Sequence, residues 1–433
     1  MSDRPPEILG NFTDRITYGF TNPMPTTESG PFMITAKDIN HGRILYEQAR
    51  RTSKIDFDTL TDKSRPKIGD LLLTKDGTLG RMAIVDREGI CVNQSVAVLT
   101  PNNRIKPLYL KYLLEAPQNF RRMINDADGS TIKHIYITRL AKLTVDVPSL
   151  IIQERIISML GSIDHKIELN RQMNEKMELI AQEIFKDWFV DFGPVNRKKQ
   201  GNTSPDKILG GLIPDPNRAA VIATIFPNSL DDDDLPEGWK RTTLEEYADL
   251  NPESWTKKNH PKSIRYLDLK NTKWGNIGEF SDYDWSDAPS RARRIVKPSD
   301  TIVGTVRPGN GSYCYISENG YTASTGFAVL RPKQNKFTNY IYICATRSEN
   351  IKRLAHKADG AAYPAIRPNI VHETEALKFS IELMAEFESI ISPIRSKIEQ
   401  GKKENQILAE TRDYLLPKLI SGQVSIADID EAA

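Results

Sequence analysis

The sequence predicts an α+β protein with two repeated mixed α/β heads, separated by two long antiparallel coiled-coil helices in a pseudo-twofold arrangement. The first observation behind this prediction is an internal repeat, in which residues 67–103 match residues 297–333. Identical residues recur at a spacing of 230 or 231: Lys67 and Lys297, Asp70 and Asp300, Gly80 and Gly311, Gly89 and Gly320, Val98 and Val329, Pro101 and Pro332. Solenoid units run roughly 20–50 residues, so this period indicates a duplicated domain with its connector.

The second observation is a heptad pattern after each copy. Apolar residues and asparagines recur at alternating steps of four and three, and the pattern returns 231 residues later. The first seam comprises Ile156, Leu160, Ile163, Ile167, Asn170, Asn174, Met177, Ala181, Ile184 and Trp188, and the second comprises Phe387, Ile391, Ile394, Ile398, Gly401, Asn405, Leu408, Arg412, Leu415 and Leu419. About 35 residues make a helix of roughly 50 Å. Pro393 lacks a backbone donor and is expected to kink or start the second helix.

An amphipathic helix of this length needs a partner for its apolar stripe. We expect the two helices to pack on each other, with Asn174 and Asn405 in equivalent seam positions, where a buried asparagine sets the register. The alternative is that each helix packs only on its own head as part of that core.

The domain boundaries follow from the repeat and from composition. Pro and Gly residues and the acidic run Asp231–Asp234 indicate a linker, and Leu235–Trp239 restarts ordered structure. The expected parts are the first head (1–150), the first long helix (151–190), the linker (191–234), the second head (235–375), the second long helix (376–422) and a C-terminal tail (423–433).

Each head has the pattern of a mixed α/β domain. Short apolar runs predict strands at Leu71–Leu73, Val96–Leu99, Ile302–Val306 and Phe327–Leu330, and helices follow at Leu108–Leu114 and Tyr340–Ala345. Between the strands lies a Gly-rich loop, Lys75–Arg81 in the first head and Arg307–Ser312 in the second. Such a loop can present backbone amides and a basic side chain to phosphate, or it can be a hairpin turn that uses glycine for positive φ.

The charge of the chain is unevenly distributed. The net charge is +2, but residues 1–150 hold 21 Lys+Arg against 17 Asp+Glu, and residues 235–375 hold 21 against 16. Both heads are therefore basic, which suits a polyanion such as double-stranded DNA, and the rest of the chain is acidic. Ordinary scatter of charge is the alternative.

Bulk composition excludes several classes of protein. Hydrophobic residues make up 39% of the chain, and no apolar run approaches the roughly 18 residues of a membrane span. The N-terminal residues lack a secretory pattern, and the three cysteines form no framework. We therefore expect a cytoplasmic protein with no membrane partner.

Candidate DNA-binding residues are basic side chains and the polar triplets that follow the loops. Asparagine and glutamine can pair with adenine edges or cap turns, and the basic clusters are phosphate clamps or solvated surface. The candidates are Arg50, Arg51, Lys75, Thr78, Arg81, Asn93, Gln94, Ser95 and Lys133 in the first head, and Arg291, Arg293, Arg294, Arg307, Asn310, Ser312, Ser324 and Thr325 in the second.

No catalytic pattern is evident in the sequence. The Asn/Asp-Pro-Pro-aromatic motif of amino methylation, GxGxxG after a strand, GxxxxGK[ST], HExxH and Cys/His zinc spacing are all missing. We expect a recognition protein with no catalytic residue, no metal and no cofactor of its own.

At this point the chain resembles the specificity (S) subunit of type I restriction–modification systems. The duplicated head, the stretch Gly69–Gly80, the segment Gln153–Val195 and the restart at Leu235–Trp239 carry the resemblance, which covers nearly the whole chain. The first head departs from the pattern, because it begins abruptly at Ile8 without such a start. We therefore expect its N-terminal strand to be shortened.

The resemblance implies a fold, partners and a function. Each head would be a target recognition domain that binds one half of a bipartite, asymmetric DNA target, and the coiled coil would set the gap between the halves. The helices would dock two methyltransferase (modification) subunits, and restriction/translocase subunits would complete this host-defence complex for DNA methylation and cleavage. S-adenosylmethionine, ATP and Mg would belong to those partners. The partner-binding candidates are Phe185, Trp188, Phe189, Leu416 and Leu419.

Two other functions stay open at this stage. One is a coiled-coil adaptor with protein-binding heads, for which binding would not weaken as salt rises. The other is a stand-alone DNA nuclease, which would need a carboxylate cluster for a metal that the sequence does not reveal.

Overall fold

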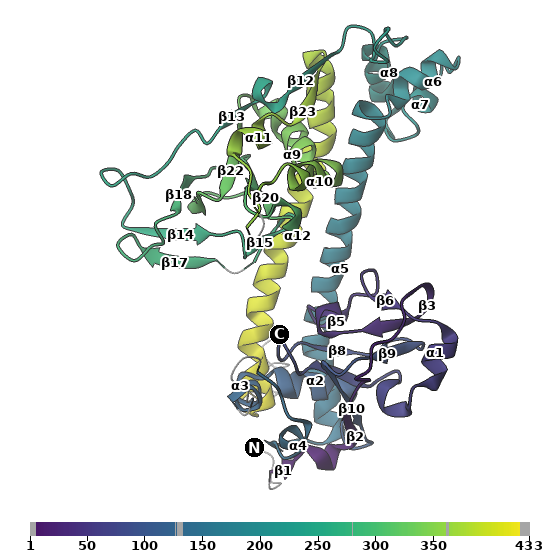
Figure 1. Ribbon diagram of the computed structural model, residues 1–433, viewed down its shortest axis with the longest axis vertical. Helices are drawn as coiled ribbons and strands as arrows, with labels where there is room; N and C mark the ends of the chain where they lie inside the picture. The colour runs from purple at the N-terminus through teal and green to yellow at the C-terminus, as the bar shows by residue number, and fades with distance from the viewer. Residues whose placement is uncertain (1–5, 126, 128–132, 279, 361–362, 425–433) are drawn as a thin grey trace. The chain divides into compact units, whose positions relative to one another are not determined.

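The computed structural model describes residues 6–125, 127, 133–278, 280–360 and 363–424, so most of the predicted tail lies outside it. Contacts divide the chain into two compact units, Met1–Leu169 with Glu404–Ala433, and Asn170–Lys403. Each unit contains one head and one part of each long helix, α5 (Leu150–Phe189) and α12 (Ile381–Ile420). Figure 1 labels their elements.

The described residues of the first head form a four-stranded sheet, a three-stranded sheet, two two-stranded sheets and four short α-helices. Its elements are β1 (Glu7–Ile8), β2 (Thr13–Tyr18), β3 (Thr27–Ile34), β4 (Ile39–Asn40), β5 (Arg43–Ile44), β6 (Arg50–Arg51), α1 (Lys54–Thr59), β7 (Leu71–Thr74), β8 (Met82–Ile84), β9 (Ile90–Val92), β10 (Val96–Pro101), α2 (Pro107–Glu115), α3 (Pro117–Asn125), α4 (Ile137–Ala141) and β11 (Thr144–Val145). The main sheet has the antiparallel order β2-β10-β7-β8. The second sheet, β6-β3-β9, contains the parallel pair β3–β9.

Both faces of the main sheet are buried, which explains its continuous apolar strands. Leu71 and Leu73 of β7 belong to the core that includes α2 and the start of α5. Leu72, between them, belongs to a second core with Ile34 of β3 and Val92 of β9. Because side chains alternate along a strand, Leu71 and Leu73 lie on one face of the sheet and Leu72 lies on the other.

The second head repeats this construction. Its elements are β12 (Lys240–Thr243), β13 (Ala248–Leu250), β14 (Ser263–Leu267), β15 (Thr272–Lys273), β16 (Asn276–Ile277), β17 (Ser281–Asp284), β18 (Ala292–Ile295), β19 (Thr301–Gly304), β20 (Tyr313–Tyr315), β21 (Tyr321–Ser324), β22 (Phe327–Pro332), α9 (Thr338–Thr346), α10 (Ser348–His356), α11 (Pro368–His372) and β23 (Glu375–Lys378). The main sheet has the order β13-β22-β19-β20, which matches that of the first head strand for strand. The predicted strands and the helices α2 and α9 are thus confirmed in both heads.

The heads differ in their second sheet. In the second head its order is β17-β14-β21-β18, so β14 has an antiparallel neighbour, β17, that pairs along four residues. The corresponding strand of the first head, β3, pairs instead with the two-residue β6. The expected short N-terminal strand is also confirmed, because β1 has two residues and β12 has four.

Within each unit the segments of α5 and α12 pack antiparallel. In the first unit Arg412 Nη1 donates to Asp164 Oδ1 at 3.0 Å, and Asn405 Nδ2 donates to the Ile167 carbonyl at 3.1 Å. In the second unit Arg395 Nη1 donates to Glu178 Oε2 at 2.6 Å. Residue numbers rise along one helix as they fall along the other, so the expected helix pairing is confirmed.

The alternative expectation, that each helix packs on its own head, also describes part of the seam. Leu160 of α5 belongs to the core of the first head, and Phe387 and Ile391 of α12 belong to that of the second. Both helices therefore serve as core and as seam. Pro393 does not start α12, which is continuous from Ile381 through Pro393 to Ile420, so only a kink there stays a prediction.

Residues 191–234 are more ordered than the linker expected from composition. They form α6 (Gly193–Lys199), α7 (Pro205–Ile208) and α8 (Pro216–Ile225). Arg197 of α6 pairs with Asp187 of α5 through bonds of 2.9 and 2.6 Å. Ile222 of α8 is fully buried in the core of the second unit. Each of these helices has Pro in its first turn. They are too short to show a heptad pattern, so the sequence did not predict them.

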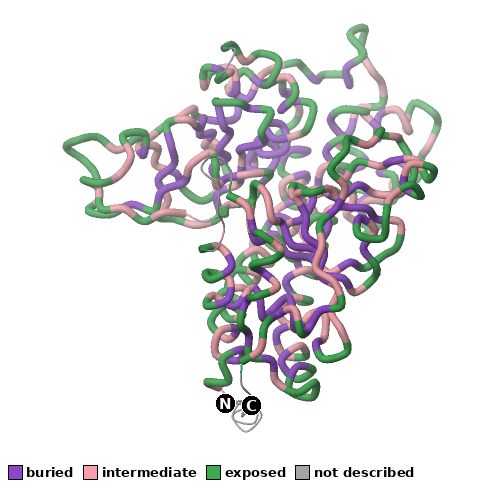
Figure 2. Tube along the Cα trace, turned by 60° about the horizontal axis from the view of Figure 1, so that its bottom comes forward, coloured by how far each residue is buried: buried purple, intermediate pink, exposed green. Residues whose placement is uncertain are grey.

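Burial follows this construction throughout. Figure 2 shows buried residues along the strands and the inner sides of the helices, and exposed residues in the loops that join them. The three cysteines, Cys91, Cys314 and Cys344, are buried and free. Within the described residues, no helix is long and apolar enough to cross a membrane.

Candidate nucleic-acid interface

The Gly-rich loop of the first head joins β7 to β8 and is tied to the segment before α4. The backbone N–H of Ile135 donates to the carbonyl of Lys75 at 2.9 Å. Gly80 has a φ of +81°, and a Cβ at this position would lie 2.5 Å from the Phe120 ring on α3. The loop therefore requires glycine both for its backbone and for its close approach to α3.

The loop of the second head has the same scaffold. Ile366 N–H donates to the Thr305 carbonyl at 2.9 Å, and Arg307 N–H donates to the Pro364 carbonyl at 2.7 Å. Gly311 also has a positive φ, +65°. The two loops are thus anchored alike by a backbone bond to the segment before α4 or α11, but seven residues (75–81) form the first and eight (305–312) form the second, and their side chains differ.

Three polar side chains meet beside the first loop. Asp76 Oδ2 accepts a 2.8 Å bond from Lys75 Nζ, and Asp76 Oδ1 lies 2.7 Å from His134 Nδ1. Lys75 Nζ also lies 5.3 Å from the centroid of the Tyr18 ring. Asp76 holds the ammonium and the imidazole in place, where a phosphate oxygen could compete for both.

A pocket of about 240 Å³ opens beside this cluster, lined by Tyr18, Lys75, His134, Ile135, Tyr136 and Ile137. The Tyr18 and Tyr136 side chains are 37% and 45% exposed. Aromatic rings next to a cation suit a nucleotide, whose sugar or base packs on the ring while the phosphate contacts the charge.

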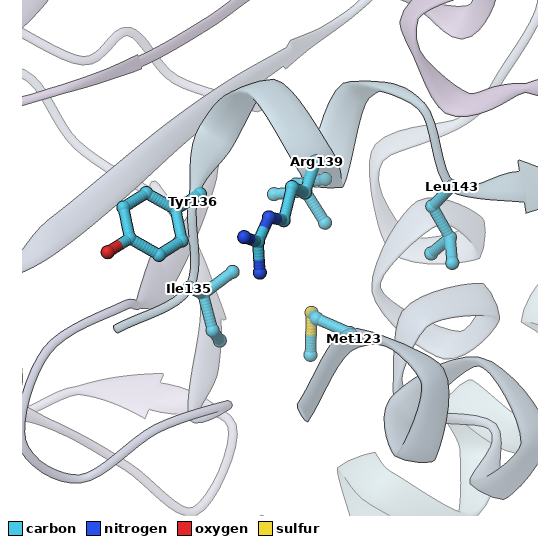
Figure 3. Close-up of a pocket in the computed structure, with 6 residues that line it drawn as sticks. Met123, Ile135, Tyr136, Arg139 and Leu143 are labelled. Carbon is cyan, nitrogen blue, oxygen red and sulfur yellow. The ribbon is translucent and has the colours of Figure 1, made fainter. Parts of the chain in front are cut away.

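The floor beneath Tyr136 is apolar. Figure 3 shows Met123 of α3, Ile135 and Leu143 around a small hollow, into which Arg139 of α4 points. The Arg139 guanidinium lies 5.0 Å from the Tyr136 ring centroid, within cation–π range. Packing from below and a cation beside it hold Tyr136 at the surface.

Other candidates in the first head divide into structural and exposed groups. Arg51 lies 3.9 Å over the Phe32 ring, and Arg81 Nη1 donates to the Ile39 carbonyl at 3.3 Å. Both guanidinium groups contact their own head. The exposed candidates are Arg50, Thr78, Gln94 and Lys133.

The polar triplets form turns. Asn93 Oδ1 accepts bonds from the N–H and the Oγ of Ser95, at 3.2 and 2.6 Å. Ser324 Oγ accepts a 3.1 Å bond from Gly326 N–H. These contacts favour the turn-capping interpretation of Asn93, Ser95 and Ser324 over base contact. Thr325, beside Ser324, is exposed.

The basic cluster of the second head divides among three environments. Arg291 is exposed. Arg293 lies 4.4 Å over the Trp285 ring, which stacks on His260 with centroids 4.3 Å apart. Arg294 Nη1 donates to Ser254 Oγ at 3.2 Å, and burial lowers its pKa.

The loop of the second head exposes Arg307 and Asn310. The Arg307 guanidinium lies 4.6 Å from the centroid of the Tyr363 ring, which is 72% exposed. Ser312 is different, because its side chain donates to the Leu269 carbonyl at 2.8 Å and the residue is 3% exposed.

Two DNA-binding candidates are therefore corrected. Ser312 and Ser324 are buried, at 3% and 1% exposure. The Ser312 hydroxyl donates to the Leu269 carbonyl, and the Ser324 hydroxyl accepts from the Gly326 N–H. Neither side chain is placed to touch DNA. The remaining candidates stay predictions.

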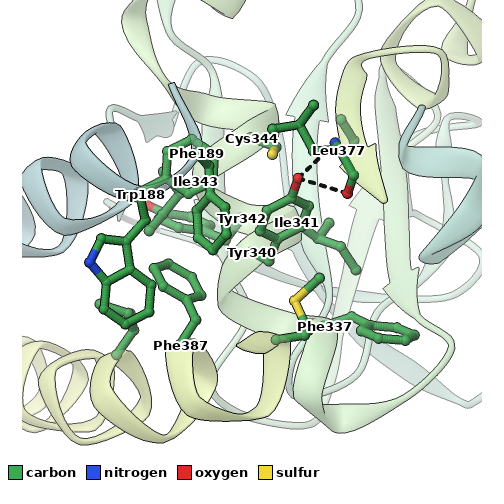
Figure 4. Close-up of a cluster of buried hydrophobic side chains, with 14 of the residues drawn as sticks. Trp188, Phe189, Phe337, Tyr340, Ile341, Tyr342, Ile343, Cys344, Leu377 and Phe387 are labelled. Atoms are coloured by element: carbon green, nitrogen blue, oxygen red, sulfur yellow. Dashed lines mark hydrogen bonds between the residues drawn. The ribbon is translucent and has the colours of Figure 1, made fainter. Parts of the chain in front are cut away.

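The five partner-binding candidates that the resemblance implied are buried in the cores of the two units. Trp188 and Phe189 lie in the core of the second unit with Tyr340 and Phe387, as Figure 4 shows, and Phe185 packs with them. Leu416 and Leu419 lie in the core of the first unit. These side chains are at most 5% exposed, so they offer no surface on which a partner could dock.

The long helices expose other apolar side chains instead. On α5, Met173, Leu179 and Ile180 are 43%, 59% and 50% exposed. On α12, Ile407 and Tyr414 are 56% and 63% exposed. Met173 and Ile180, like Ile407 and Tyr414, are seven residues apart, so each pair shares one face of its helix. This second heptad row was present in the sequence but lay outside the seam.

Sequence reasoning also missed the aromatic residues of the interface. Tyr18, Tyr136, Tyr363, Trp285 and His260 lie far from the Gly-rich loops in the sequence or in segments without a regular pattern. The positions of Tyr136 and Tyr363 depend on the backbone bonds that join each loop to the segment before α4 or α11. Among the described residues, no group of His, Cys, Asp or Glu could hold a metal ion.

These observations define a class: a two-headed protein whose heads present cations and aromatic rings on repeated loops. A family model described as the type I restriction modification DNA specificity domain matches residues 24–179. The chain is similar to type I restriction enzyme specificity subunits over most of its length.

Two curated relatives match over most of their lengths. The HindI specificity subunit of Haemophilus influenzae is 24% identical over 471 residues, covering 98% of this chain and all of that protein. The MjaIX specificity subunit of Methanocaldococcus jannaschii is 22% identical, covering 92% and 87%. The crystal structure of the S subunit from M. genitalium covers 96% of this chain and 95% of that one, with 17% identity and a TM-score of 0.51. The predicted α+β fold is thus confirmed.

Proposed function

We propose that this chain is the sequence-specific DNA-binding subunit of a type I restriction–modification complex, in which each head binds one half of a bipartite, asymmetric target. The observation that carries the proposal is the repeated loop scaffold with unlike side chains. Lys75, Asp76 and His134 occupy the loop region of the first head, and Arg307 with Tyr363 that of the second. Equal scaffolds give equal docking geometry, and unlike side chains give unlike target bases.

Mapping of modified adenines tests this proposal. The full chain is expressed with its modification subunit, and methylated positions are compared between the parent and Arg307→Ala/Tyr363→Ala. We expect relaxed specificity in one half-site and no change in the other. Lys403→Ala, on the exposed side of α12, is the matched control. Loss of specificity in both half-sites at once would contradict separate reading by the two heads.

The exposed heptad rows are the proposed docking faces for the methyltransferase subunits. Met173, Leu179 and Ile180 on α5 present apolar surface that neither unit covers in the described structure. Large exposed apolar side chains on a long helix suit burial against partner helices. Restriction/translocase subunits would join the assembled complex.

Co-purification with the modification subunit tests this docking face. Leu179→Glu/Ile180→Glu should weaken complex formation by about tenfold or more, because two desolvated apolar contacts are replaced by charges. Ile55→Glu, at an 80% exposed position on α1, is the control with the same chemical change. Equal retention of the modification subunit by both variants would exclude this face.

We propose that the chain is a recognition subunit with no catalytic role of its own, in keeping with the specificity subunits to which it is similar. We propose that it holds no cofactor, and that S-adenosylmethionine, ATP and Mg act on the partner subunits. Its place of action would be the cytoplasm, where the DNA target is found. Weakening of DNA binding as salt rises would separate this function from that of a protein-binding adaptor.

A further inference from the structure

The two arginine–carboxylate pairs between the long helices have the same polarity. In the first unit, Asp164 of α5 pairs with Arg412 of α12 at 3.0 Å. In the second unit, Glu178 of α5 pairs with Arg395 of α12 at 2.6 Å. In both pairs the acid comes from α5 and the arginine from α12, although the two helices are copies of each other.

These charges are held in place by their own units. Asp164 Oδ2 accepts a 2.8 Å bond from Tyr112 Oη, and Lys111 Nζ lies 3.9 Å away. The Arg395 guanidinium lies 4.1 Å over the Tyr342 ring, and its side chain is 3% exposed. Neither charge can swing into solvent without losing these contacts.

The repeat shows what each helix would meet in a copy of itself. Helices α5 and α12 begin and end 231 residues apart, so Arg395 occupies on α12 the position that Asp164 occupies on α5. If α5 paired with a second α5 in the observed register, Glu178 would face Asp164. If α12 paired with a second α12, Arg412 would face Arg395. Both pairings bring like charges together twice, in a poorly solvated interface.

A steric feature gives the same selection independently. Gly401 of α12 lies against Asn174 of α5, and a Cβ at Gly401 would be 2.7 Å from Asn174 Oδ1. The counterpart of Gly401 on α5 is Asn170, which has a side chain. In an α5·α5 pair, Asn170 would therefore collide with Asn174 at the place where α12 supplies a glycine.

One ion pair between the long helices has the opposite polarity, and it is more exposed than the two arginine pairs. Lys166 of α5 pairs with Glu404 of α12 at 3.4 Å, with both side chains nearly half exposed. In an α12·α12 pair, Lys397 would face Glu404, which is attractive. Exposed ion pairs contribute little, so this contact does not offset the repulsion between Arg412 and the buried Arg395.

We propose that the two long helices have diverged into a selective pair: α5 accepts α12 and rejects a second copy of α5, and α12 rejects a second copy of itself. The duplicated chain thereby joins its own two halves and avoids self-association through like helices. This inference concerns helix pairing alone and does not depend on DNA recognition.

Cysteine cross-linking of the full chain reports which pairing forms. Asn174→Cys/Gly401→Cys joins α5 to α12 within one chain, because the ideal Gly401 Cβ lies 3.2 Å from Asn174 Cγ. Asn170→Cys/Asn174→Cys joins α5 to α5 between two chains. The native cysteines are buried and give little background. With native charges, we expect the first pair to cross-link as a monomer and the second to stay uncross-linked.

Charge reversal then tests the cause. Glu178→Arg opposes Arg395 in the native pair and complements Asp164 in an α5·α5 pair. We expect it to raise the Asn170→Cys/Asn174→Cys dimer fraction roughly tenfold or more. Glu183→Arg makes the same charge change at an exposed position of α5 and should leave this fraction unchanged. An equal dimer fraction in the two variants would overturn the proposal.

A second variant covers the case in which Glu178→Arg does not fold. Glu178→Arg/Arg395→Glu restores an intrachain pair with reversed polarity, and it also makes both like pairings complementary. We expect a folded chain whose α5·α5 cross-linked fraction exceeds that of the parent. A fraction equal to that of the parent would show that charge does not select the pairing.

Discussion

Arg331 of β22 donates two hydrogen bonds, at 2.9 and 2.8 Å, to the fully buried carboxylate of Asp300. Asp300 also accepts a 2.8 Å bond from the backbone N–H of Lys297, three residues earlier. Its counterpart in the first head, Asp70, accepts the same backbone bond from Lys67 at 2.9 Å. Yet its arginine comes from another strand, since Arg15 of β2 lies 3.3 Å away. The turn is preserved in both heads, and its ion partner is not.

The first prediction concerns the stability of the second head. Asp300→Asn leaves Arg331 without its buried counter-charge and should lower the free energy of unfolding by about 3 kcal/mol. Urea unfolding of the full chain measures the change. Glu253→Gln removes the other acid that contacts Arg331, but Glu253 is 39% exposed, so the expected loss is below about 1 kcal/mol. Equal losses in the two variants would contradict this account.

The second prediction concerns the loop of the first head. Gly80→Ala should destabilise the chain by about 2–4 kcal/mol, because left-handed strain adds to a clash with Phe120. Gly77→Ala is the matched control: its φ is +78°, but no atom lies within 4 Å of the added Cβ. Its cost should be about 1 kcal/mol, from backbone strain alone. Thermal unfolding of both variants separates the cost of backbone strain from that of the clash with Phe120. Equal losses of stability in the two variants would show that the close approach to Phe120 contributes nothing.

The third prediction concerns phosphate contact. Arg307→Ala should weaken binding to duplex DNA and reduce the slope of log affinity against log salt by about one, the contribution of a single phosphate contact. Fluorescence anisotropy at several salt concentrations measures the slope. Lys403→Ala also removes one exposed cation, from α12, and should leave the slope unchanged. An unchanged slope for Arg307→Ala would place that side chain away from the phosphate backbone.

The fourth prediction concerns the cysteines. Burial raises the pKa of the Cys91, Cys314 and Cys344 thiols to about 12. The reactive thiolate is therefore scarce at pH 8, and access to the sulfur is blocked as well. A chromogenic disulfide reagent should detect no fast-reacting thiol in the folded chain and three after denaturation. Fast reaction of a thiol in the native chain would contradict its burial.

The duplication and the seam were accessible from sequence because both are periodic. A repeat at 231 residues is visible in identical residues such as Gly80 and Gly311. The alternating steps of four and three between seam residues such as Ile156, Leu160 and Ile163 depend only on helix geometry. The strand cores were predictable for the same reason, since both faces of β7 and β10 are buried and their sequences are continuously apolar.

Which candidate DNA-binding and partner-binding side chains are exposed could not be predicted without the tertiary structure. Trp188 and Phe189 have the composition of a docking face, but the helices α6–α8 and α12 bury them. Ser312 and Ser324 are residue types that can contact bases, but Ser312 is buried against the distant Leu269 carbonyl and Ser324 in a turn with Gly326. A local sequence pattern predicts which side chains share a face, but it does not predict which other element of the fold covers that face.

By itself, the sequence of this protein determined two heads, two helices and a basic charge on each head, because repeats, heptads and composition are local properties of the chain. The tertiary structure decided that Tyr136 stands beside Lys75, that Tyr363 stands beside Arg307, and that α5 contributes the acids while α12 contributes the arginines. Those relationships join residues far apart in the chain, and only the folded backbone brings them within reach of each other.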